Sequence, residues 1–407
     1  MKVVVLAEEF GGEGLSPAGL WLDELARSWE ARGHQMLIVC SRPHPQGDSS
    51  QITFRRGIKV WHPGPDRFEE ALGEALAEPI DVVHVMGDGP YGARVLEAFR
   101  ELPVLLDVHD FWPICPNDDL LRRPRLEPCG EHFPYSGCGE CAGLHRLRAM
   151  DERSELVATA RAILVHSTVN RVRMSAGLDR SVELLGYGVD VTRFRPEDPP
   201  APKAADVAQL FETRGRPRVL FLGPPTVARG AGRLIDILVA LQTRLPDAEL
   251  VVAGRDPQNP DWGHVFQLEM RELGLADHVT LLPSVSPDDL PALYGSCLVA
   301  IAPGSGHPPG GLFLLQALAS GLPVIAHPSA GVYEWIHQGV EGIIVEATDV
   351  PAFAAAVATM LIDPYARNSF GESGRLAALE SHDFTRTVAM LEEIYRSCGA
   401  SGRSAAA

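Results

Sequence analysis

The chain has 407 residues, of which 45% are hydrophobic and 22% charged, and its formal net charge is −17. This length and composition are typical of a globular protein with two domains, and the acidic balance argues against general nucleic-acid binding and gives no support for docking on anionic lipid. Because no apolar run approaches the roughly 20 residues of a membrane span, and Met1 leads directly into a predicted strand, we expect a cytoplasmic protein without an integral membrane segment.

The N-terminal part alternates apolar runs with amphipathic stretches. KVVVLA at 2–7 predicts a buried strand, and Ser16-Pro17 predicts the start of a helix that runs to Arg32. This alternation predicts a parallel sheet with helices on both faces and ligands at the carboxyl ends of its strands. The turn FGGEG is not a complete dinucleotide fingerprint, and no acidic residue is placed to hold a ribose, which argues against a Rossmann oxidoreductase. Further strands are predicted at 35–40, 58–61, 82–86, 104–108, 163–166 and 182–185.

Four of the seven cysteines lie in a polar insertion rich in proline and glycine, predicted at 111–142, with the spacing Cys-x13-Cys-x8-Cys-x2-Cys. In a reducing compartment this pattern favours a tetrahedral structural zinc site over disulfides. The metal would replace a hydrophobic core, because the segment is too polar to fold alone. An iron–sulfur cluster and two disulfides are the alternatives. The four residues are Cys115, Cys129, Cys138 and Cys141.

A change of composition divides the chain. EDPPAPKAAD lies in a predicted linker at 197–217, after a first domain at 1–196, and VLFLG at 219–223 starts a second alternation of strands and helices. The second domain is predicted at 218–380. A helix at 381–400 is expected to return to the first domain, and 401–407 to be a frayed tail.

The second domain contains a strand, a glycine-rich turn and a helix in succession. LVAIA at 298–302 predicts a buried strand, 304–311 holds four glycines and two prolines, and 312–320 predicts a helix. The unsatisfied N–H groups and the dipole of such a helix form a site for an anion such as phosphate. From these residues alone, a tight turn that binds no ligand is as well supported as an anion site.

The segment LFLLQALASGLPVIA at 312–326 closely resembles the nucleotide-sugar signature of family 4 glycosyltransferases with the GT-B fold. The resemblance implies two Rossmann-like, doubly wound parallel-sheet domains that face a cleft. It also implies retaining transfer of a sugar from a nucleotide-diphosphate donor, of the UDP or GDP type, to a small-molecule or secondary-metabolite acceptor.

The resemblance also assigns roles to single residues. DVHDFWPIC resembles the family's His-Asp segment, which places His109 beside the donor sugar, and Arg229 takes the place of a lysine that grips the diphosphate. These two residues are the catalytic candidates. The donor-binding candidates are Gly12, Gly14, Gly223, Arg229, His307, Gly310, Gly311, Leu312 and Gln316.

Three positions depart from the family pattern. Gln316 replaces the second signature glutamate, Pro308 or His307 stands at the first, and Pro224 replaces an arginine. A neutral acceptor such as glutamine gives up roughly half the strength of a charge-assisted hydrogen bond. Because function resides in the site rather than the fold, a catalytically weakened homologue that binds a nucleotide or a partner enzyme is the first alternative. A nucleotide-sugar epimerase is the second.

Overall fold

A computed structural model divides the chain into two compact units, each described here by itself: residues 1–187 with 385–407 form unit 1, and residues 188–384 form unit 2. The structure describes residues 1–10, 16–30, 32–41, 51–55, 57–62, 73, 75, 79–87, 99–123, 127–130, 137–212, 215–223, 225–226, 229–254, 261–282, 284–304, 311–329 and 331–403.

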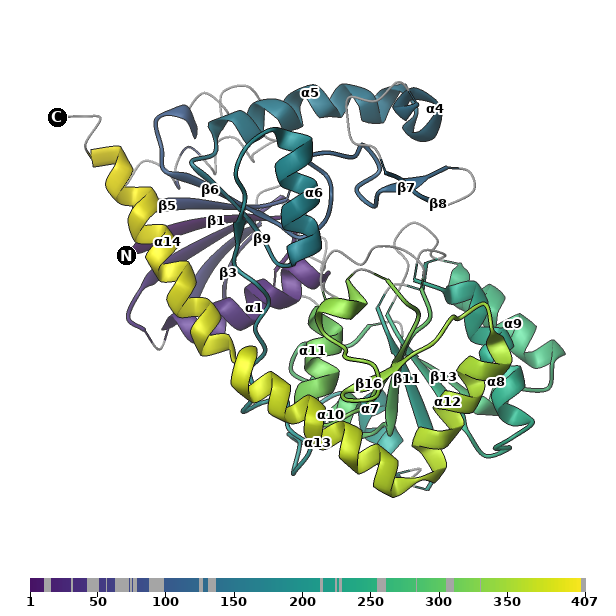
Figure 1. The fold of residues 1–407 in the computed structure, drawn as a ribbon. Coiled ribbons are helices and arrows are strands. Elements are labelled where there is room, and N and C mark those ends of the chain that lie inside the picture. The colour runs from purple at the N-terminus through teal and green to yellow at the C-terminus, as the bar shows by residue number, and fades with distance from the viewer. Residues whose placement is uncertain are drawn as a thin grey trace. The chain divides into compact units, whose positions relative to one another are not determined.

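Unit 1 is built on an eight-stranded sheet in the order β10-β9-β6-β5-β1-β2-β4-β3 (Figure 1). Neighbouring strands are parallel except for β3, which pairs antiparallel with β4 at one edge. The near-continuous apolar strands β1, β5 and β6 are buried, as expected for a parallel sheet covered on both faces. The strands are β1 (Lys2–Ala7), β2 (Gln35–Cys40), β3 (Gln51–Arg55), β4 (Ile58–His62), β5 (Val82–Met86), β6 (Val104–Val108), β9 (Ala162–Val165) and β10 (Glu183–Leu184).

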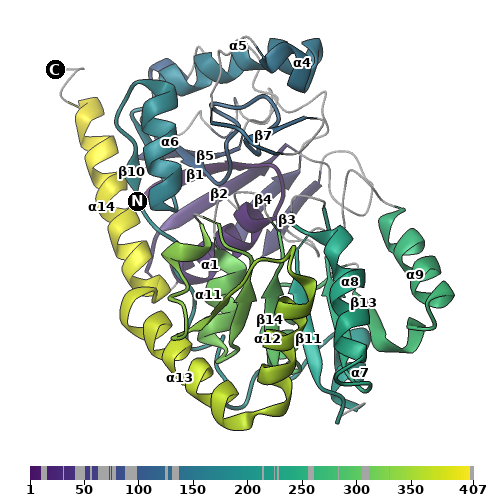
Figure 2. The same cartoon turned by 45° about the vertical axis from the view of Figure 1, so that its right-hand side comes forward.

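Helices cover this sheet on both faces (Figures 1 and 2). The predicted helix start at Ser16 is confirmed, because its hydroxyl accepts a hydrogen bond from the amide of Gly19 at 3.2 Å. A short hairpin of β7 (Leu121–Arg122) and β8 (Glu127–Pro128) stands apart from the main sheet. The helices are α1 (Pro17–Glu30), α4 (Cys138–Ala142), α5 (Leu144–Thr159), α6 (Thr168–Leu178) and α14 (Phe384–Arg403), which groups with unit 1 from Thr385.

Unit 2 is built on a six-stranded parallel sheet in the order β13-β12-β11-β14-β15-β16. The strands are β11 (Arg218–Leu222), β12 (Glu249–Ala253), β13 (Val279–Leu282), β14 (Val299–Ala302), β15 (Val324–Ala326) and β16 (Gly342–Ile344). The helices are α7 (Ala205–Glu212), α8 (Ala231–Gln242), α9 (Trp262–Glu272), α10 (Leu290–Gly295), α11 (Leu312–Ala319), α12 (Val350–Ile362) and α13 (Pro364–Ser381), with short 3-10 turns at η2 (Ala276–His278) and η3 (Val332–Glu334). The predicted fold class, two parallel-sheet α/β domains, is confirmed.

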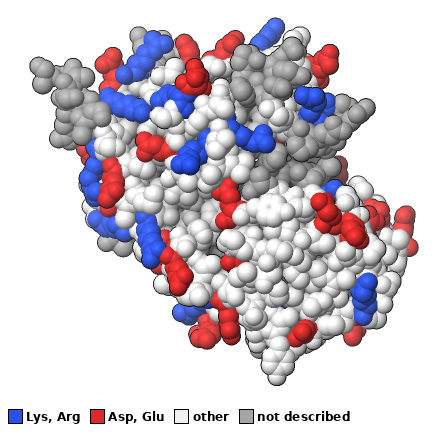
Figure 3. Space-filling model, in the orientation of Figure 1, with Lys and Arg blue, Asp and Glu red and all other residues white. Residues whose placement is uncertain are grey.

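The surface of unit 1 mixes charges of both signs. On the face drawn in Figure 3, Lys and Arg side chains are interspersed with Asp and Glu rather than gathered into a patch of one sign. Within the described part of the chain, the helices lack the combination of length and apolar character that crossing a membrane requires.

Candidate functional site

The turns that follow β11, β12 and β14 in unit 2 pack against one another through their backbones. Gly254 has φ +133°, and a β-carbon added to it would lie 2.5 Å from the carbonyl oxygen of Gly223. Gly230 has φ +84°, and its β-carbon would lie 2.7 Å from the backbone of Pro303. Only glycine fits such approaches. The carboxyl ends of the three central strands therefore meet in one backbone-lined edge, where open α/β sheets bind ligands.

Two arginines near the start of α8 lie at this edge. The guanidinium of Arg229 lies over the turn after β11, because a β-carbon on Gly223 would be 2.6 Å from its Nη1 atom. Arg233 donates a hydrogen bond from Nη1 to the carbonyl oxygen of Pro303 at 2.8 Å. The structure thus brings Arg229 and Gly223 together, and Arg233 bonds to the neighbouring turn after β14. A contact of these residues with a donor stays a prediction.

The helix α11 begins at the same edge. Gly311 is its N-cap residue and supplies no side-chain hydrogen bond to the first turn, in which Leu312 is buried. A side chain at Gly311 would collide with Trp335, whose ring carbon Cδ1 would lie 2.4 Å from the added β-carbon. Gly311 therefore has no side chain that could cap the first N–H groups of α11, which suits an anion.

Gln316 lies on the buried side of α11. Its side chain is 1% exposed, and its Oε1 atom accepts a hydrogen bond from the hydroxyl of Tyr294 at 3.2 Å. The side chain therefore has a partner inside unit 2, and contact with a ribose stays a prediction. Other predicted donor-site positions lie outside the described residues: Gly12, Gly14, Pro224, His307, Pro308 and Gly310.

Unit 1 carries a buried polar cluster at the carboxyl ends of β5, β6 and β9. His109 follows β6, is 9% exposed, and has Nδ1 2.7 Å from the hydroxyl of Tyr187. Asp107 lies two residues earlier on the same face of the strand, and its carboxylate is bonded to His84 at 3.1 Å and to His166 at 2.6 Å. The sequence singled out His109 but not Asp107, although the two-residue spacing between them predicts that they share a face.

The cluster shifts the pKa values of Asp107 and His109. Burial raises the pKa of Asp107, but the charges of His166 and His109 outweigh burial and hold it well below its ordinary value. Burial lowers the pKa of His109 and outweighs the opposing attraction of Asp107. Asp107 is therefore ionised and His109 neutral near pH 7.

Both shifts predict that unit 1 loses stability in acid. Below its ordinary pKa of about 6.5, His109 takes up a proton in the unfolded chain but not in the folded one, so the free energy of unfolding falls by up to about 1.4 kcal/mol per pH unit. The stabilisation from Asp107 is present above about pH 3.9 and is lost below it. Urea unfolding at several pH values between about 7 and 5 measures how the free energy of unfolding depends on pH through His109. In His109→Gln this dependence on pH should be weaker, and an unchanged dependence would contradict the assignment to His109.

The cysteines of the insertion are described, and none forms a disulfide. The Sγ atom of Cys141 accepts hydrogen bonds from the amide of Arg123 and from Nδ2 of Asn117, both at 3.3 Å. Burial raises the pKa of the Cys115 thiol, although backbone N–H groups that bond to it act in the opposite direction. Among the described residues, groups of three ligand atoms within 4.8 Å of one another do not include these cysteines. The predicted metal site is therefore not confirmed.

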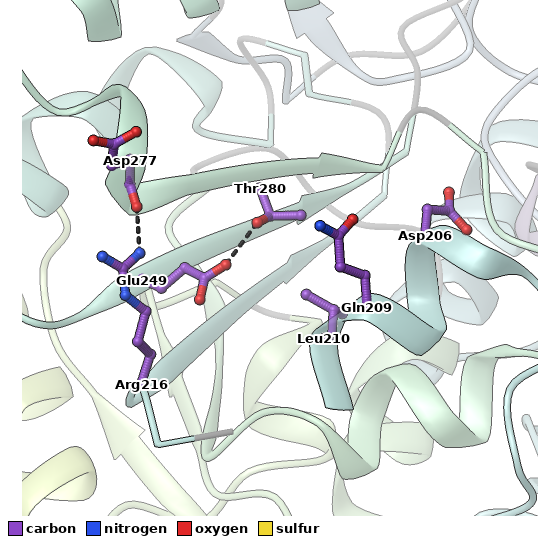
Figure 4. Close-up of a pocket in the computed structure, with 7 residues that line it drawn as sticks. All are labelled: Asp206, Gln209, Leu210, Arg216, Glu249, Asp277 and Thr280. Carbon is purple, nitrogen blue, oxygen red and sulfur yellow. Dashed lines mark hydrogen bonds between the residues drawn. The ribbon is translucent and has the colours of Figure 1, made fainter. Parts of the chain in front are cut away.

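A pocket of about 260 Å³ lies elsewhere on unit 2, at the amino ends of β11, β12 and β13 (Figure 4). Glu249 is central to it: it pairs with the buried Arg218 at 2.9 Å and accepts a hydrogen bond from Thr280 at 2.6 Å. Since ligands of open α/β sheets bind at the carboxyl ends of the strands, this pocket is not the candidate donor site. Its lining residues are Asp206, Gln209, Leu210, Arg216, Glu249, Asp277 and Thr280.

Comparison with known proteins finds two matching family models. Residues 21–133 match the family model of the glycosyl transferase 4-like domain, and residues 203–377 match that of glycosyl transferases group 1. The GDP-mannose-dependent alpha-(1-6)-phosphatidylinositol monomannoside mannosyltransferase of Mycolicibacterium smegmatis is 32% identical over 233 residues, which are 56% of this chain and 59% of that protein. Alpha-maltose-1-phosphate synthase of the same organism is 26% identical over 98% of this chain and 100% of its own length.

A solved structure confirms the fold. Sucrose-phosphate synthase from Thermosynechococcus elongatus superimposes with a TM-score of 0.72 and 19% identity, over 98% of this chain and 100% of that one. The two matched family models lie in the two halves of the chain and together cover most of it. The chain therefore combines a glycosyl transferase 4-like domain with a glycosyl transferases group 1 domain and has the GT-B fold.

Proposed function

We propose that the protein is a retaining glycosyltransferase that moves a sugar from a nucleotide-diphosphate donor to a small-molecule acceptor. The observation that carries the proposal is the backbone-lined edge of unit 2, where Arg229 lies over the turn at Gly223 and α11 begins at Gly311, which has no side chain to cap it. A guanidinium and the N–H groups at the start of a helix are donors that bind a diphosphate well. The two matching family models support this chemistry.

The proposed donor carries GDP or UDP. The mycobacterial relative is named as GDP-mannose-dependent, which supports GDP between these two. Retention without a protein nucleophile requires attack from the face that the leaving group occupies, so the protein contributes positioning and electrostatic stabilisation of the departing diphosphate. Arg229, with Arg233 beside it, would carry the stabilisation, and His109 would help to position the donor sugar and the acceptor.

Replacing Arg229 tests the phosphate assignment. A hydrogen bond to a charged group contributes about 1.5–3 kcal/mol, so Arg229→Ala should raise the Kd of UDP or GDP by about 10- to 100-fold in titration calorimetry. Arg244→Ala, which removes an exposed arginine of the same unit, should leave the Kd unchanged. Equal affinity of Arg229→Ala and the unaltered protein would show that the diphosphate is held elsewhere.

A second candidate function is a nucleotide-binding scaffold with weakened catalysis. The hydrogen bond between Gln316 and Tyr294 favours it, because a neutral, buried side chain stands where the family signature has a glutamate. A thermal-shift screen with UDP, GDP, ADP and TDP sugars tests the donor site that both functions require. An enzyme and a scaffold should each respond to one base class, so turnover separates them, and no response to any of the four would count against the proposed donor site.

For the cysteine insertion we also propose a structural zinc site. The N–H groups that bond to the sulfur of Cys141 would also support it as a metal ligand, and four cysteines are the number that tetrahedral zinc takes. Elemental analysis of the purified chain should find about one zinc per molecule. The metal should be lost in Cys138→Ser and retained in Cys297→Ser, which alters unit 2. Protein that contains neither zinc nor iron would remove the proposal.

A further inference from the structure

The carboxylate of Asp107 is shared by three histidines inside unit 1. Its Oδ1 atom lies 2.6 Å from Nε2 of His166 and 3.5 Å from Nε2 of His109, and its Oδ2 atom lies 3.1 Å from Nε2 of His84. The four side chains are all at least nine-tenths buried. The proposed transfer gives a role only to His109, so the shared carboxylate needs a separate explanation.

A bound metal does not explain the cluster. The ligand atoms of Asp107, His109 and His166 all lie within 4.8 Å of one another, which makes a metal conceivable. Two ligands of a tetrahedral ion, each about 2.0–2.1 Å from it, lie about 3.3 Å apart. The 2.6 Å between Asp107 and His166 is shorter and is a hydrogen-bond distance. A shared proton therefore joins this pair.

The hydrogen bonds of His166 fix its charge. Nδ1 lies 3.2 Å from the carbonyl oxygen of Gly186, and Nε2 lies 2.6 Å from the carboxylate of Asp107. Both partners can only accept, so both ring nitrogens must donate and the ring is an imidazolium. Because Asp107 is ionised, the two form a neutral pair, which limits the cost of burying either charge.

His84 and His109 then carry one proton each. Nε2 of His84 faces Asp107 and donates to it, which leaves Nδ1 to accept from the hydroxyl of Tyr395 at 2.5 Å. Nε2 of His109 makes no hydrogen bond to a described residue, and it lies 3.5 Å from Oδ1 of Asp107. A proton on this nitrogen points at the carboxylate, whereas a lone pair there would face a negative charge in a buried site.

We infer that Asp107 is a positioning residue that holds His109 with its proton on Nε2 and its Nδ1 lone pair bonded to the hydroxyl of Tyr187, while His166 stays a buried cation. The consequence for catalysis rests on the proposed function. His109 has no lone pair left to act as a general base. As the donor's sugar–phosphate bond breaks and the acceptor's oxygen bonds to the sugar, the acceptor's proton therefore goes to the departing phosphate.

Nuclear magnetic resonance tests the proton positions directly. In protein with 15N-labelled histidines, long-range proton–nitrogen correlations near neutral pH should show His166 with two protonated ring nitrogens, and His84 and His109 with protonated Nε2 only. Variants at the three histidines assign the signals. A neutral His166, or a proton on Nδ1 of His109, would overturn the inference.

Two variants test whether Asp107 sets the proton position of His109 or only supports the fold. In Tyr187→Phe, His109 should keep its proton on Nε2, because Asp107 still faces that nitrogen. In Asp107→Asn, His109 should populate both tautomers and His166 should become neutral, whereas Asp81→Asn, the control for loss of a carboxylate in unit 1, should change neither. Unchanged histidine signals in Asp107→Asn would overturn the inference.

The turnover of the same variants completes the test. Asp107→Asn should lower kcat by about tenfold or more and leave the KM for the donor unchanged, since the donor's diphosphate is proposed to bind unit 2. A rise in KM alone would contradict a positioning role. The experiment can refute the proposed transferase activity without refuting the proton positions of the histidines. Absence of turnover in the unaltered protein, with the predicted proton positions, would refute the transferase and leave the histidine assignment intact.

Discussion

Alanine at Gly254 is expected to lower the free energy of unfolding of unit 2 by about 3 kcal/mol. Gly254 has φ +133°, which is strained for alanine, and its β-carbon would lie 2.5 Å from the carbonyl oxygen of Gly223. Such backbone strain costs about 1–3 kcal/mol, and forcing an atom into a packed contact costs a similar amount. Hydrogen exchange of the β11 and β12 amides measures this loss within unit 2.

The matched control is Gly274→Ala, also in unit 2. Gly274 has φ +71°, but a β-carbon there would meet no atom within 4 Å. Only the cost of the left-handed conformation remains, about 1–2 kcal/mol. The difference between the two variants isolates the close approach of the two turns. Equal destabilisation would mean that the turns do not pack through their backbones, and the donor edge would lose its structural basis.

The second large effect is expected at Asp107. Asp107→Ala should lower the free energy of unfolding of unit 1 by about 3–5 kcal/mol, because removal of one partner leaves a buried ion without its counter-charge. His166 has 0% exposed surface and pairs with Asp107 at 2.6 Å. Urea unfolding near neutral pH, followed by exchange of the β5 and β6 amides, measures the loss.

Asp81→Ala is the control for Asp107→Ala. Asp81 accepts a hydrogen bond from the amide of Lys2 at 2.9 Å but is only partly buried, so its loss should cost about 1 kcal/mol. If Asp107→Ala also lowers the free energy of unfolding by less than about 1 kcal/mol, Asp107 and His166 do not form an ion pair buried from water.

Buried parallel strands were predictable from the sequence, and some other elements were not. β1, β2, β5 and β6 occur at their predicted residues, because a strand covered on both faces is a short, uniformly apolar run. β3 was missed because its apolar residues are exposed, 49% for Ile52 and 73% for Phe54. It is an antiparallel edge strand and lacks the signature of a buried one.

The predicted linker shows how composition can hide structure. Residues 188–217 group with unit 2, and α7 forms within the stretch predicted to be linker. The prolines and charged residues before it suggest an extended segment, yet Val207 and Leu210 are buried with helical spacing. A two-residue apolar stripe in a short helix is too weak to outweigh that composition.

The candidate site was predictable only in part. Arg229 and His109 lie at the carboxyl ends of strands, as the order of elements predicts. The partners of the buried groups were not predictable, because Asp107, Tyr187 and Tyr395 come from distant parts of the chain. A single sequence does not say which strands are neighbours, and that adjacency brings the three histidines onto one carboxylate.

Mass-spectrometric detection of turnover tests the central claim most directly. The 407-residue chain, incubated with UDP and GDP sugars, should release the nucleoside diphosphate from one of them, slowly by hydrolysis alone and faster with a sugar-accepting alcohol. Arg229→Ala should release it more slowly. Intact sugar nucleotides after prolonged incubation with every donor, in protein that binds one of them, would contradict a glycosyltransferase and favour a scaffold.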